Sequence, residues 1–335
     1  MSKATLAVIA AVSATAGAVA TAAVFSLSSP KKSEAAPTTT ALATRPLPVP
    51  VPVPASQVFT PAAPHVPASS APVNPSGLFQ YGFPGPVADL ATRQALVSSY
   101  DRRTRNPHWV AEHITPESLA RRDGDRKNSA FLEDPAIPPQ FQAKLKDYFR
   151  SGYDRGHQVP AADCKWSQRA MDDTFFLSNM CPQVGEGFNR DYWAHFEDFC
   201  RRLTTRYPSV RVVTGPLYLP KRDPADNKWY VRYEVIGSPP NVAVPTHFYK
   251  VIYAEEQAAP GGKVALGAFV LPNAVIPNDK PLADFEVPLE AVERASGLEF
   301  ATKLPAERRK RLCAETSCAV VVKEYAERQK AFAKK

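Results

Sequence analysis

Cysteine is scarce in this chain of 335 residues, and its spacing argues against two common roles. Five cysteines are present, and no two of them form a Cys-x-x-Cys pair. No histidine stands near Cys313 and Cys318, so the ligand set of a structural zinc site is missing. So few cysteines in so long a chain also argue against a disulfide framework. Most of the thiols are therefore expected to be buried and unreactive.

Acidic residues are absent from the start of the chain, where the first one is Glu34. Residues 4–28 carry no charge at all, and about 20 apolar residues span a bilayer as a helix. The stretch is rich in weakly hydrophobic alanine, and three interpretations stay open: a membrane anchor, a cleaved secretory signal, or part of a mitochondrial import signal. We favour mitochondrial import with a membrane-anchoring role, and assign residues 1–35 to this segment.

Proline dominates the next segment, with eleven prolines between positions 37 and 75 and the run PLPVPVPVP at 46–54. Proline removes backbone donors and favours the extended polyproline II conformation, so this stretch cannot build a core. Residues 36–76 are therefore predicted to form a disordered linker that holds the following domain away from whatever the N-terminus enters.

The remainder, residues 77–335, has the composition of one globular domain and shows no internal repeat. A helical spacing of apolar residues occupies 190–203, and a shorter helix is expected at 288–298. Alternating or β-branched runs typical of strands occupy 105–114, 209–215, 246–255 and 265–273. Several strands with few helices between them predict an α+β fold with a central, mostly antiparallel sheet flanked by helices.

Positive charge is in excess, with a net charge of +8 and a pI near 9.2. Residues 303–335 hold ten Lys or Arg against four Asp or Glu, which predicts a basic C-terminal helix. This balance permits binding to a polyanion such as a nucleic acid. A solvated helix with a basic face explains the tail equally well.

The segment DRGHQVPAAD at 154–163 carries the residues best suited to chemistry. Arg155 and His157 stand two apart, so on an extended segment their side chains share one side. Gly156 allows a close approach of the backbone. An imidazole can take a proton from water, and a guanidinium can hold a phosphate through two hydrogen bonds. Most histidines are structural, but this combination favours phosphate chemistry.

A second group of polar residues follows in the segment 177–199. Asn189 directly precedes the predicted helix and Glu197 lies eight residues later, roughly on the same helical face, so both are expected to point into one cleft. An amide oxygen suits Mg²⁺, which keeps most of its waters and takes few protein ligands. Glu197 would then order those waters. Judged by spacing alone, an exposed helix acid is the simpler interpretation of Glu197.

Taken in order, these motifs resemble those of a known family. DRGH is followed by MDDTFFLSNMCPQ at 171–183, FNRDYWAHFED at 188–198 and TGPLYLP at 214–220. The chain thereby resembles the DNA/RNA non-specific endonucleases with a ββα-metal (His-metal finger) active site, and more closely the mitochondrial endonuclease G branch, especially its fungal members. The resemblance covers roughly residues 77–325.

The resemblance implies a role for each matching residue. His157 is the general base that activates water, and Asn189 is the direct protein ligand of Mg²⁺, for which Mn²⁺ can substitute. Glu197 holds metal-bound water, and Asn179 supports the histidine region. The residues expected to contact the substrate phosphates are Arg155 and Arg126. Asp154 is expected to hold its loop by accepting backbone hydrogen bonds.

Three positions depart from the family pattern. Arg190 is basic where relatives often carry a neutral polar residue, and it is expected to touch substrate. Asp163 is an acid where relatives often carry an amide, so it is expected either to affect the metal site or to lie on the surface. Cys181 stands where many relatives have alanine, and a buried small thiol is the simpler interpretation than a redox role. None of these departures removes a catalytic group.

The function implied is that of a mitochondrial, Mg²⁺-dependent endonuclease that cuts DNA and RNA and leaves 5′-phosphate products. The resemblance also implies a homodimer, residence in the intermembrane space or at the inner membrane, and release to the nucleus. Roles in mitochondrial DNA turnover and in DNA degradation during cell death follow, with an unidentified protein inhibitor. Two alternatives are a catalytically silent nucleic-acid-binding protein and a membrane-tethered scaffold that binds partners through the proline-rich segment.

Overall fold

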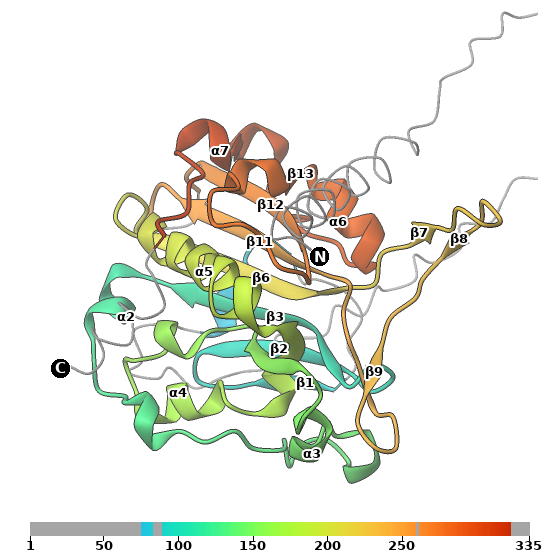
Figure 1. The fold of residues 1–335 in the computed structure, drawn as a ribbon. Coiled ribbons are helices and arrows are strands. Elements are labelled where there is room, and N and C mark those ends of the chain that lie inside the picture. The colour runs from blue at the N-terminus through green and yellow to red at the C-terminus, as the bar shows by residue number, and fades with distance from the viewer. Residues whose placement is uncertain (1–74, 83–88, 259–260, 323–335) are drawn as a thin grey trace, which may run out of the picture.

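The computed structural model describes residues 75–82, 89–258 and 261–322 (Figure 1). The predicted N-terminal segment 1–35, the linker 36–76 up to residue 74, and the basic tail from residue 323 lie outside these ranges. Within the described part of the chain, no helix is both long enough and apolar enough to span a membrane.

One eight-stranded sheet forms the centre of the molecule, and all its pairings are antiparallel except that of β12 with β14. This confirms the predicted α+β fold with a mostly antiparallel sheet. The strands, in spatial order, are β1 (Leu90–Thr92), β2 (Leu96–Asp101), β3 (Asn106–Ile114), β6 (Ser209–Leu217), β11 (His247–Glu255), β12 (Val264–Pro272) and β13 (Glu286–Val287), with β14 (Arg309–Arg311) beside β12.

Three small sheets and several helices surround this centre. The small pairs are β4 (Tyr153–His157) with β5 (Met180–Val184), β7 (Lys221–Arg222) with β8 (Trp229–Tyr230), and β9 (Val235–Ile236) with β10 (Val242–Ala243). The helices are α2 (Pro116–Ala120), α3 (Leu145–Tyr148), α4 (Gln168–Asp173), α5 (Tyr192–Leu203), α6 (Leu289–Ser296) and α7 (Leu312–Glu315).

The four predicted strands form β3, β6, β11 and β12, and the predicted helices form α5 and α6. Gly297, just after α6, has φ +72°, a left-handed conformation that glycine adopts without strain and that ends the helix. The periodicity of apolar side chains therefore located the long elements within one or two residues of their ends.

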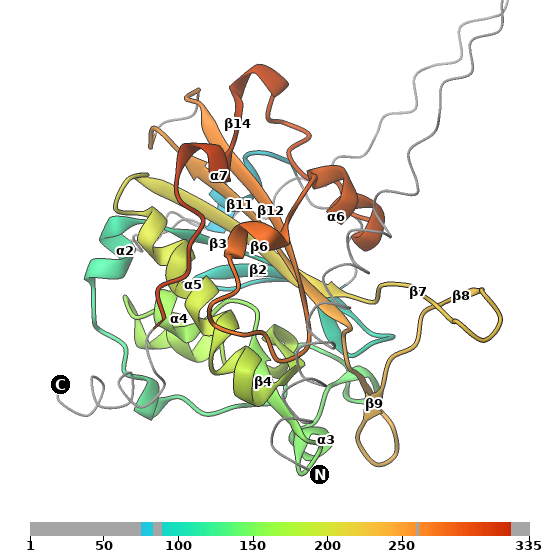
Figure 2. The same cartoon turned by 45° about the horizontal axis from the view of Figure 1, so that its top comes forward.

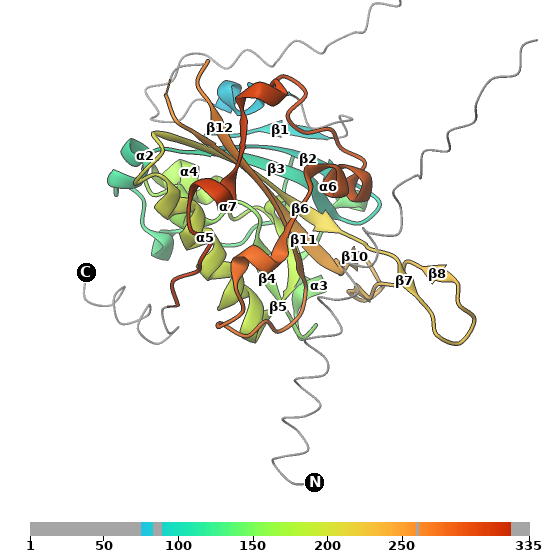
Figure 3. The ribbon, with the colours of Figure 1, turned by 90° about the horizontal axis from the view of Figure 1, so that it is seen from above.

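The central sheet is buried on both faces, because α5 covers one face and α6 the other (Figure 2). Side chains of β11 alternate between the two cores: Phe248 and Ile252 pack under α5, whereas Tyr249 and Val251 pack on the α6 side. The two helices stay well apart in the view from above as well (Figure 3).

The chain enters the described fold through a short 3₁₀ helix, η1 (Pro75–Phe79), on the α6 side of the sheet. Leu78 and Tyr81 belong to the core on that side. Tyr81 stacks on Tyr253 with 5.0 Å between the ring centroids, and Arg211 Nε donates to the carbonyl of Gly77 at 2.7 Å. These contacts fix the entry point to the sheet.

The cysteines follow the prediction only in part. Cys164, Cys181 and Cys200 are buried free thiols, and burial raises the pKa of each, which fits an unreactive role. Cys313 and Cys318 instead form a disulfide, with their Cα atoms 5.3 Å apart. The sequence argued only against a disulfide framework, and this single bond closes one local turn at α7; Cys313 and Cys318 are therefore not among the free thiols expected for most of the cysteines.

Candidate active site

The strand β4 carries DRGH and pairs with β5 in a two-stranded antiparallel sheet. In this sheet, Gly156 pairs with Cys181 and His157 with Met180. A Cβ at position 156 would overlap the buried side chain of Gln183, so the predicted close approach at this glycine is real. Together β4, β5 and α5 supply the strand–strand–helix order that the resemblance implies.

His157 is buried with only 8% of its surface exposed, and it lies against two aromatic rings. Its ring centroid is 4.9 Å from that of Phe175 in an edge-on arrangement and 5.6 Å from that of Phe131. Burial lowers the pKa of His157 to about 3, and the positive charge of Arg126 acts in the same direction. The imidazole is therefore neutral, and its Nε2 has no hydrogen-bond partner among the described residues.

Two exposed arginines stand over the same pair of aromatic rings. The Arg155 guanidinium is 4.2 Å from the centroid of Phe131, and that of Arg126 is 5.4 Å from the centroid of Phe175. Because Phe131 touches both Arg155 and His157, the two side chains lie on one side of β4, as their spacing predicts. The structure thus gathers a neutral imidazole and two cations around one aromatic pair.

Asp154 lies in β4 and binds two side chains from the segment just before α5. Its carboxylate accepts hydrogen bonds from Asn189 Nδ2 at 2.8 Å and from Arg190 at 2.7 and 2.8 Å. Burial raises the pKa of Asp154, but these bonds outweigh it and leave the pKa below its usual value. The expectation of backbone hydrogen bonds was wrong, because two side-chain donors occupy this carboxylate. Arg190, which was expected to contact substrate, forms an ion pair with Asp154 in this structure.

Asn189 and Glu197 belong to different elements. Asn189 ends the short π-helical turn η6 (Gly185–Asn189), and α5 begins only at Tyr192, after a non-helical conformation at Asp191. The prediction that both lie on one continuous helical face was therefore wrong. Burial raises the pKa of Glu197 to about 7, while the nearby charges of Lys250 and Arg201 act in the opposite direction.

Asn179, at the end of the 3₁₀ turn η5 (Leu177–Asn179), has the supporting geometry that was expected. Its Nδ2 donates to the carbonyls of Val159 and Thr174 at 3.0 and 2.8 Å, and its Oδ1 accepts from Val159 N at 3.1 Å. The buried amide thereby clamps the segment that follows His157. Both hydrogens of its amide nitrogen are used, so the side chain has no free N–H to donate to a substrate.

Asp163 lies in the interior and not on the surface. It is buried, and its Oδ1 forms an ion pair with Arg201 at 2.7 Å. Its Oδ2 is buried without a hydrogen-bond partner among the described residues. The alternative that Asp163 is a surface residue was wrong, because α5 places Arg201 where it pairs with this acid.

Sequence reasoning missed the two aromatic residues that shape the site. Phe131 and Phe175 have ring centroids 5.0 Å apart, and their loops are joined because Leu132 N donates to the Phe175 carbonyl at 3.1 Å. Phe175 lies within the motif at 171–183 but was given no role there, and Phe131 stands in none of the quoted motifs, so only their contacts with His157 reveal them.

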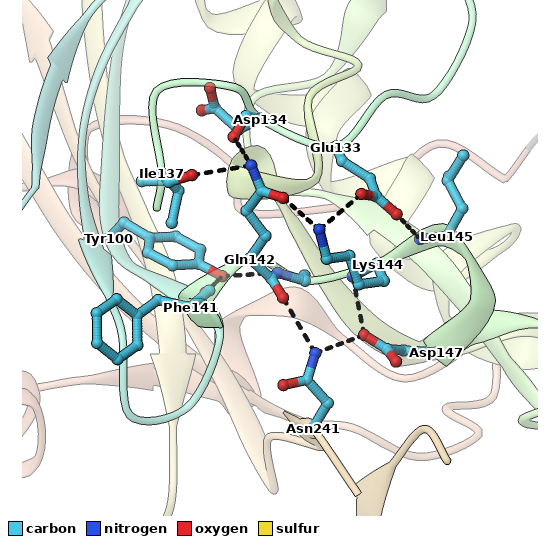
Figure 4. Close-up of polar contacts among 11 residues, drawn as sticks. Tyr100, Glu133, Asp134, Ile137, Phe141, Gln142, Lys144, Leu145, Asp147 and Asn241 are labelled. Atoms are coloured by element: carbon cyan, nitrogen blue, oxygen red, sulfur yellow. Dashed lines mark hydrogen bonds and ion pairs between the residues drawn. The ribbon is translucent and has the colours of Figure 1, made fainter. Parts of the chain in front are cut away.

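A polar network holds the loop that follows Phe131 (Figure 4). Gln142 Nε2 donates to the carbonyls of Asp134 and Ile137, at 2.8 Å each, and Lys144 Nζ donates to Glu133 at 2.9 Å. The Asp134 carboxylate is buried and binds Arg93 at 2.6 Å. These bonds fix the position of the loop that carries Phe131, one of the two rings that lie against His157.

The oxygen atoms available as metal ligands at this site fit a divalent cation that takes few protein ligands. A carboxylate can only accept, so the bond to Asp154 turns the amide nitrogen of Asn189 toward it and the amide oxygen away. Within the described ranges, no group of three His, Cys, Asp or Glu side chains could hold a metal ion. A hard cation that keeps most of its waters, such as Mg²⁺, suits one amide oxygen with a carboxylate nearby.

Comparison with known proteins shows what kind of molecule carries this site. Residues 74–307 match the DNA/RNA non-specific endonuclease family. The chain is 62% identical over 263 residues to the mitochondrial nuclease of Saccharomyces cerevisiae. The aligned region covers 78% of this chain and 80% of the yeast protein. It is 49% identical over 223 residues to human mitochondrial endonuclease G. The aligned region covers 67% of this chain and 72% of the human protein.

Among solved structures, the chain is similar to one from a crystal structure of an EndoG/EndoGI complex that addresses the mechanism of EndoG inhibition. The TM-score is 0.67 and the identity 47%, covering 72% of this chain and all of that chain. These matches define an endonuclease that hydrolyses nucleic acids. The chain belongs to the DNA/RNA non-specific endonuclease family, whose members depend on a metal, and the resemblance to its mitochondrial and fungal branch is confirmed.

Proposed function

We propose that this chain is a mitochondrial, Mg²⁺-dependent endonuclease that hydrolyses both DNA and RNA and leaves 5′-phosphate ends. One observation carries the proposal: the buried imidazole of His157 offers an unpartnered Nε2 beside the exposed guanidinium groups of Arg155 and Arg126. This arrangement suits a base that would take a proton from a water molecule bound next to a substrate phosphate.

His157 would accept a proton from the attacking water at Nε2. Burial keeps the imidazole neutral, and a substrate phosphate placed beside it would raise its low pKa toward neutrality. Arg155 and Arg126 would hold the non-bridging oxygens of that phosphate, since guanidinium groups match phosphate geometry. Phe131 and Phe175 keep both arginines and the imidazole in place.

Asn189 would hold the metal through its amide oxygen, and Glu197 would orient the water bound to it. The Mg²⁺ ion, or Mn²⁺ in its place, would supply charge stabilisation for the developing negative oxygens. Asp154 fixes the direction of the Asn189 amide, and Asn179 holds the backbone that follows His157. Nothing in this set of residues requires a ribose 2′-hydroxyl, which supports cleavage of both DNA and RNA.

The names of the relatives support a mitochondrial location, since those from Saccharomyces cerevisiae and human are both called mitochondrial. We propose that residues 1–35 direct import and contact the inner membrane, that residues 36–76 form a linker, and that residues 77–335 act as a homodimer in the intermembrane space. Release to the nucleus would allow DNA degradation in cell death, and a protein inhibitor would restrain the enzyme; the EndoG/EndoGI structure is an example of such inhibition in a similar protein.

A digestion assay with the full chain tests the proposed activity. Plasmid DNA and ribosomal RNA are incubated with Mg²⁺, with a chelator, and with the variants His157→Ala and Asn189→Ala. We expect His157→Ala to lose about 10²- to 10⁴-fold in rate, the usual contribution of a general base. His108→Ala is the matched control, because His108 is half-buried on the α6 side, where its Nε2 lies 3.0 Å from the Ser296 carbonyl.

Two results would contradict the proposal. A folded wild-type chain that binds nucleic acid but never cuts it would support the silent binding protein. A His157→Ala variant as fast as the wild type would show that another group is the base. Fractionation with protease protection tests the location, and recovery from the matrix or from secreted medium would exclude the intermembrane space.

A further inference from the structure

The turn that carries Arg126 has no core of its own. This 3₁₀ turn, η2 (Arg126–Asn128), buries none of its side chains. Its position therefore depends on hydrogen bonds and not on the burial of apolar groups. Within the turn, the Asp125 carboxylate accepts a hydrogen bond from Lys127 N at 2.9 Å and so caps the first residues. This bond stabilises the turn but does not tie it to the rest of the molecule.

One side chain of α4 ties both ends of this turn to the fold. Gln168, the first residue of α4, accepts a hydrogen bond at Oε1 from Asp125 N at 2.8 Å. Its Nε2 donates to Ser129 Oγ at 3.1 Å. Asp125 directly precedes η2 and Ser129 directly follows it, so the amide of Gln168 brackets the turn.

Asp172, one helical turn further along α4, completes this attachment. Its Oδ1 accepts hydrogen bonds from Ser129 Oγ at 2.6 Å and from Gln168 Nε2 at 2.8 Å. Because a carboxylate can only accept, it draws the amide nitrogen of Gln168 toward itself and leaves the amide oxygen for Asp125 N. The three side chains thus form a closed ring of hydrogen bonds that fixes the direction of the Gln168 amide.

The helix α4 is a firm base for this ring. Ser167, its N-cap, donates from Oγ to Gln94 Oε1 at 3.0 Å, and Asp173 at its other end accepts from Gln94 N at 3.1 Å. Gln94 lies between β1 and β2, and Ala170 in the middle of the helix is fully buried. The helix is therefore anchored to the central sheet, and the turn η2 is anchored to the helix.

The same helix also leads to the ring that lies beneath Arg126. Phe175 stands two residues after the end of α4, and its backbone N donates to the Asp172 carbonyl at 2.9 Å. The Arg126 guanidinium is 5.4 Å from the Phe175 centroid, which is itself 4.9 Å from that of His157. The segment from Gln168 to Phe175 therefore holds both the backbone of Arg126 and the aromatic surface under its guanidinium.

We propose that Gln168 is a positioning residue for substrate binding: its amide holds η2 against α4, so that the Arg126 guanidinium stands over Phe175 where a phosphate of the nucleic acid binds. The inference rests on the proposed role of Arg126 as a phosphate ligand. Gln168 contacts no substrate in this scheme and acts through Arg126 alone. A backbone that is already fixed lowers the entropic cost of ordering Arg126 when the phosphate arrives.

Binding measured without a metal tests this role apart from cleavage. The full chain is titrated with a short fluorescent DNA duplex in the presence of a chelator, and Kd is measured by anisotropy at several salt concentrations. Gln168→Met keeps the length of the side chain but removes its amide, so Kd should rise about 2- to 10-fold, as expected for the net loss of a hydrogen bond. Arg126→Ala should raise Kd about 10-fold and lower the slope of log Kd against log salt by about one, the value for one lost phosphate contact.

A double-mutant cycle decides whether Gln168 acts through Arg126. When Arg126→Ala is already present, Gln168→Met should leave Kd unchanged, because no guanidinium remains to be positioned. Gln168→Met alone should also lower the salt slope, since the phosphate contact is then formed less often. A general loss of structure would instead weaken binding by the same factor in both backgrounds.

Gln80→Met is the matched control. Gln80 is a partly buried glutamine next to η1, and its amide donates to Glu255 on the α6 side of the sheet. This variant should change neither Kd nor the salt slope. If Gln168→Met does not fold, Ser129→Ala takes its place in the cycle, because it removes two bonds of the same ring and leaves α4 intact.

The outcomes separate this inference from the proposed activity. A wild-type chain that binds the duplex but never cuts DNA when Mg²⁺ is added contradicts the proposed hydrolysis, and the Kd comparisons still decide the role of Gln168. Equal Kd values for the wild type and Gln168→Met, at equal melting temperature, refute that role. An equal loss with and without Arg126 refutes it as well, and so does an unchanged Kd in Arg126→Ala. A loss that depends on Arg126 and is accompanied by a lower salt slope supports it.

Discussion

Asp154 offers the most direct test of how the metal site is built. In the variant Asp154→Asn, an amide replaces a carboxylate that accepts one bond from Asn189 and two from Arg190. An amide has one accepting oxygen and one donating nitrogen, so it cannot accept from both neighbours in their present positions. Asn189 then loses the partner that turns its amide oxygen away from β4.

The expected magnitude follows from the role of a residue that orients a metal ligand. Loss of such a partner typically weakens metal affinity 10- to 100-fold, which corresponds to about 1.4–2.7 kcal/mol. The Mg²⁺ concentration for half-maximal cleavage of plasmid DNA should rise by this factor. The rate at saturating Mg²⁺ should stay within a few-fold of the wild type, because His157 and the two arginines proposed to bind phosphate, Arg155 and Arg126, are untouched.

Asp89→Asn is a matched control, since Asp89 also binds an arginine, Arg102, through two hydrogen bonds, but on the sheet edge near β1. It removes the same charge and should leave the Mg²⁺ dependence unchanged. If Asp154→Asn has the same half-saturating Mg²⁺ concentration as the wild type, Asp154 does not orient the metal ligand and the reasoning is refuted.

Three further predictions concern stability. Gly156→Ala should lower the free energy of unfolding by about 1–3 kcal/mol in denaturant titrations, because the new Cβ overlaps Gln183, and adding Gln183→Ala should recover much of the loss; an unchanged midpoint would contradict this packing. Burial lowers the pKa of His113 to about 3, so the stability that its neutral form contributes is complete above pH 6.5 and falls by up to about 1.4 kcal/mol per pH unit as the pH drops toward 3. His113→Asn should flatten this dependence of the free energy of unfolding on pH, measured by denaturant unfolding at several pH values. An equal slope in the variant would exclude His113 as the cause. Opening the Cys313–Cys318 bond by reduction should cost about 2 kcal/mol, seen as a lower melting temperature with cleavage retained, whereas loss of cleavage would tie α7 to the active site.

The sequence predicted the elements whose signal is local. Strands such as β11 and the helix α5 show a repeating apolar pattern, and that pattern reflects burial of one or both faces. The side shared by Arg155 and His157 follows from the geometry of any extended chain, and the structure confirms it.

Features that depend on contacts between distant segments could not be predicted in this way. Phe131 and Phe175 acquire their role only when two loops meet beside His157. Asp163 looks like a surface acid until α5 brings Arg201 to it, and the break at Asp191 that separates Asn189 from α5 has no proline or glycine to announce it. The assigned roles of the site residues stay predictions until the variants are measured.

The entry of the chain through η1 has a practical consequence for handling the protein. Arg211 and Tyr253 hold the start of the described fold on the α6 side of the sheet, whereas His157, Asn189 and Glu197 lie with α5 on the other side. A bead, a fluorescent label or a fusion partner attached ahead of residue 75 therefore joins the molecule behind the sheet. The sheet separates the two sides, so an enzyme immobilised at that end presents the face proposed for catalysis to long polymers in solution.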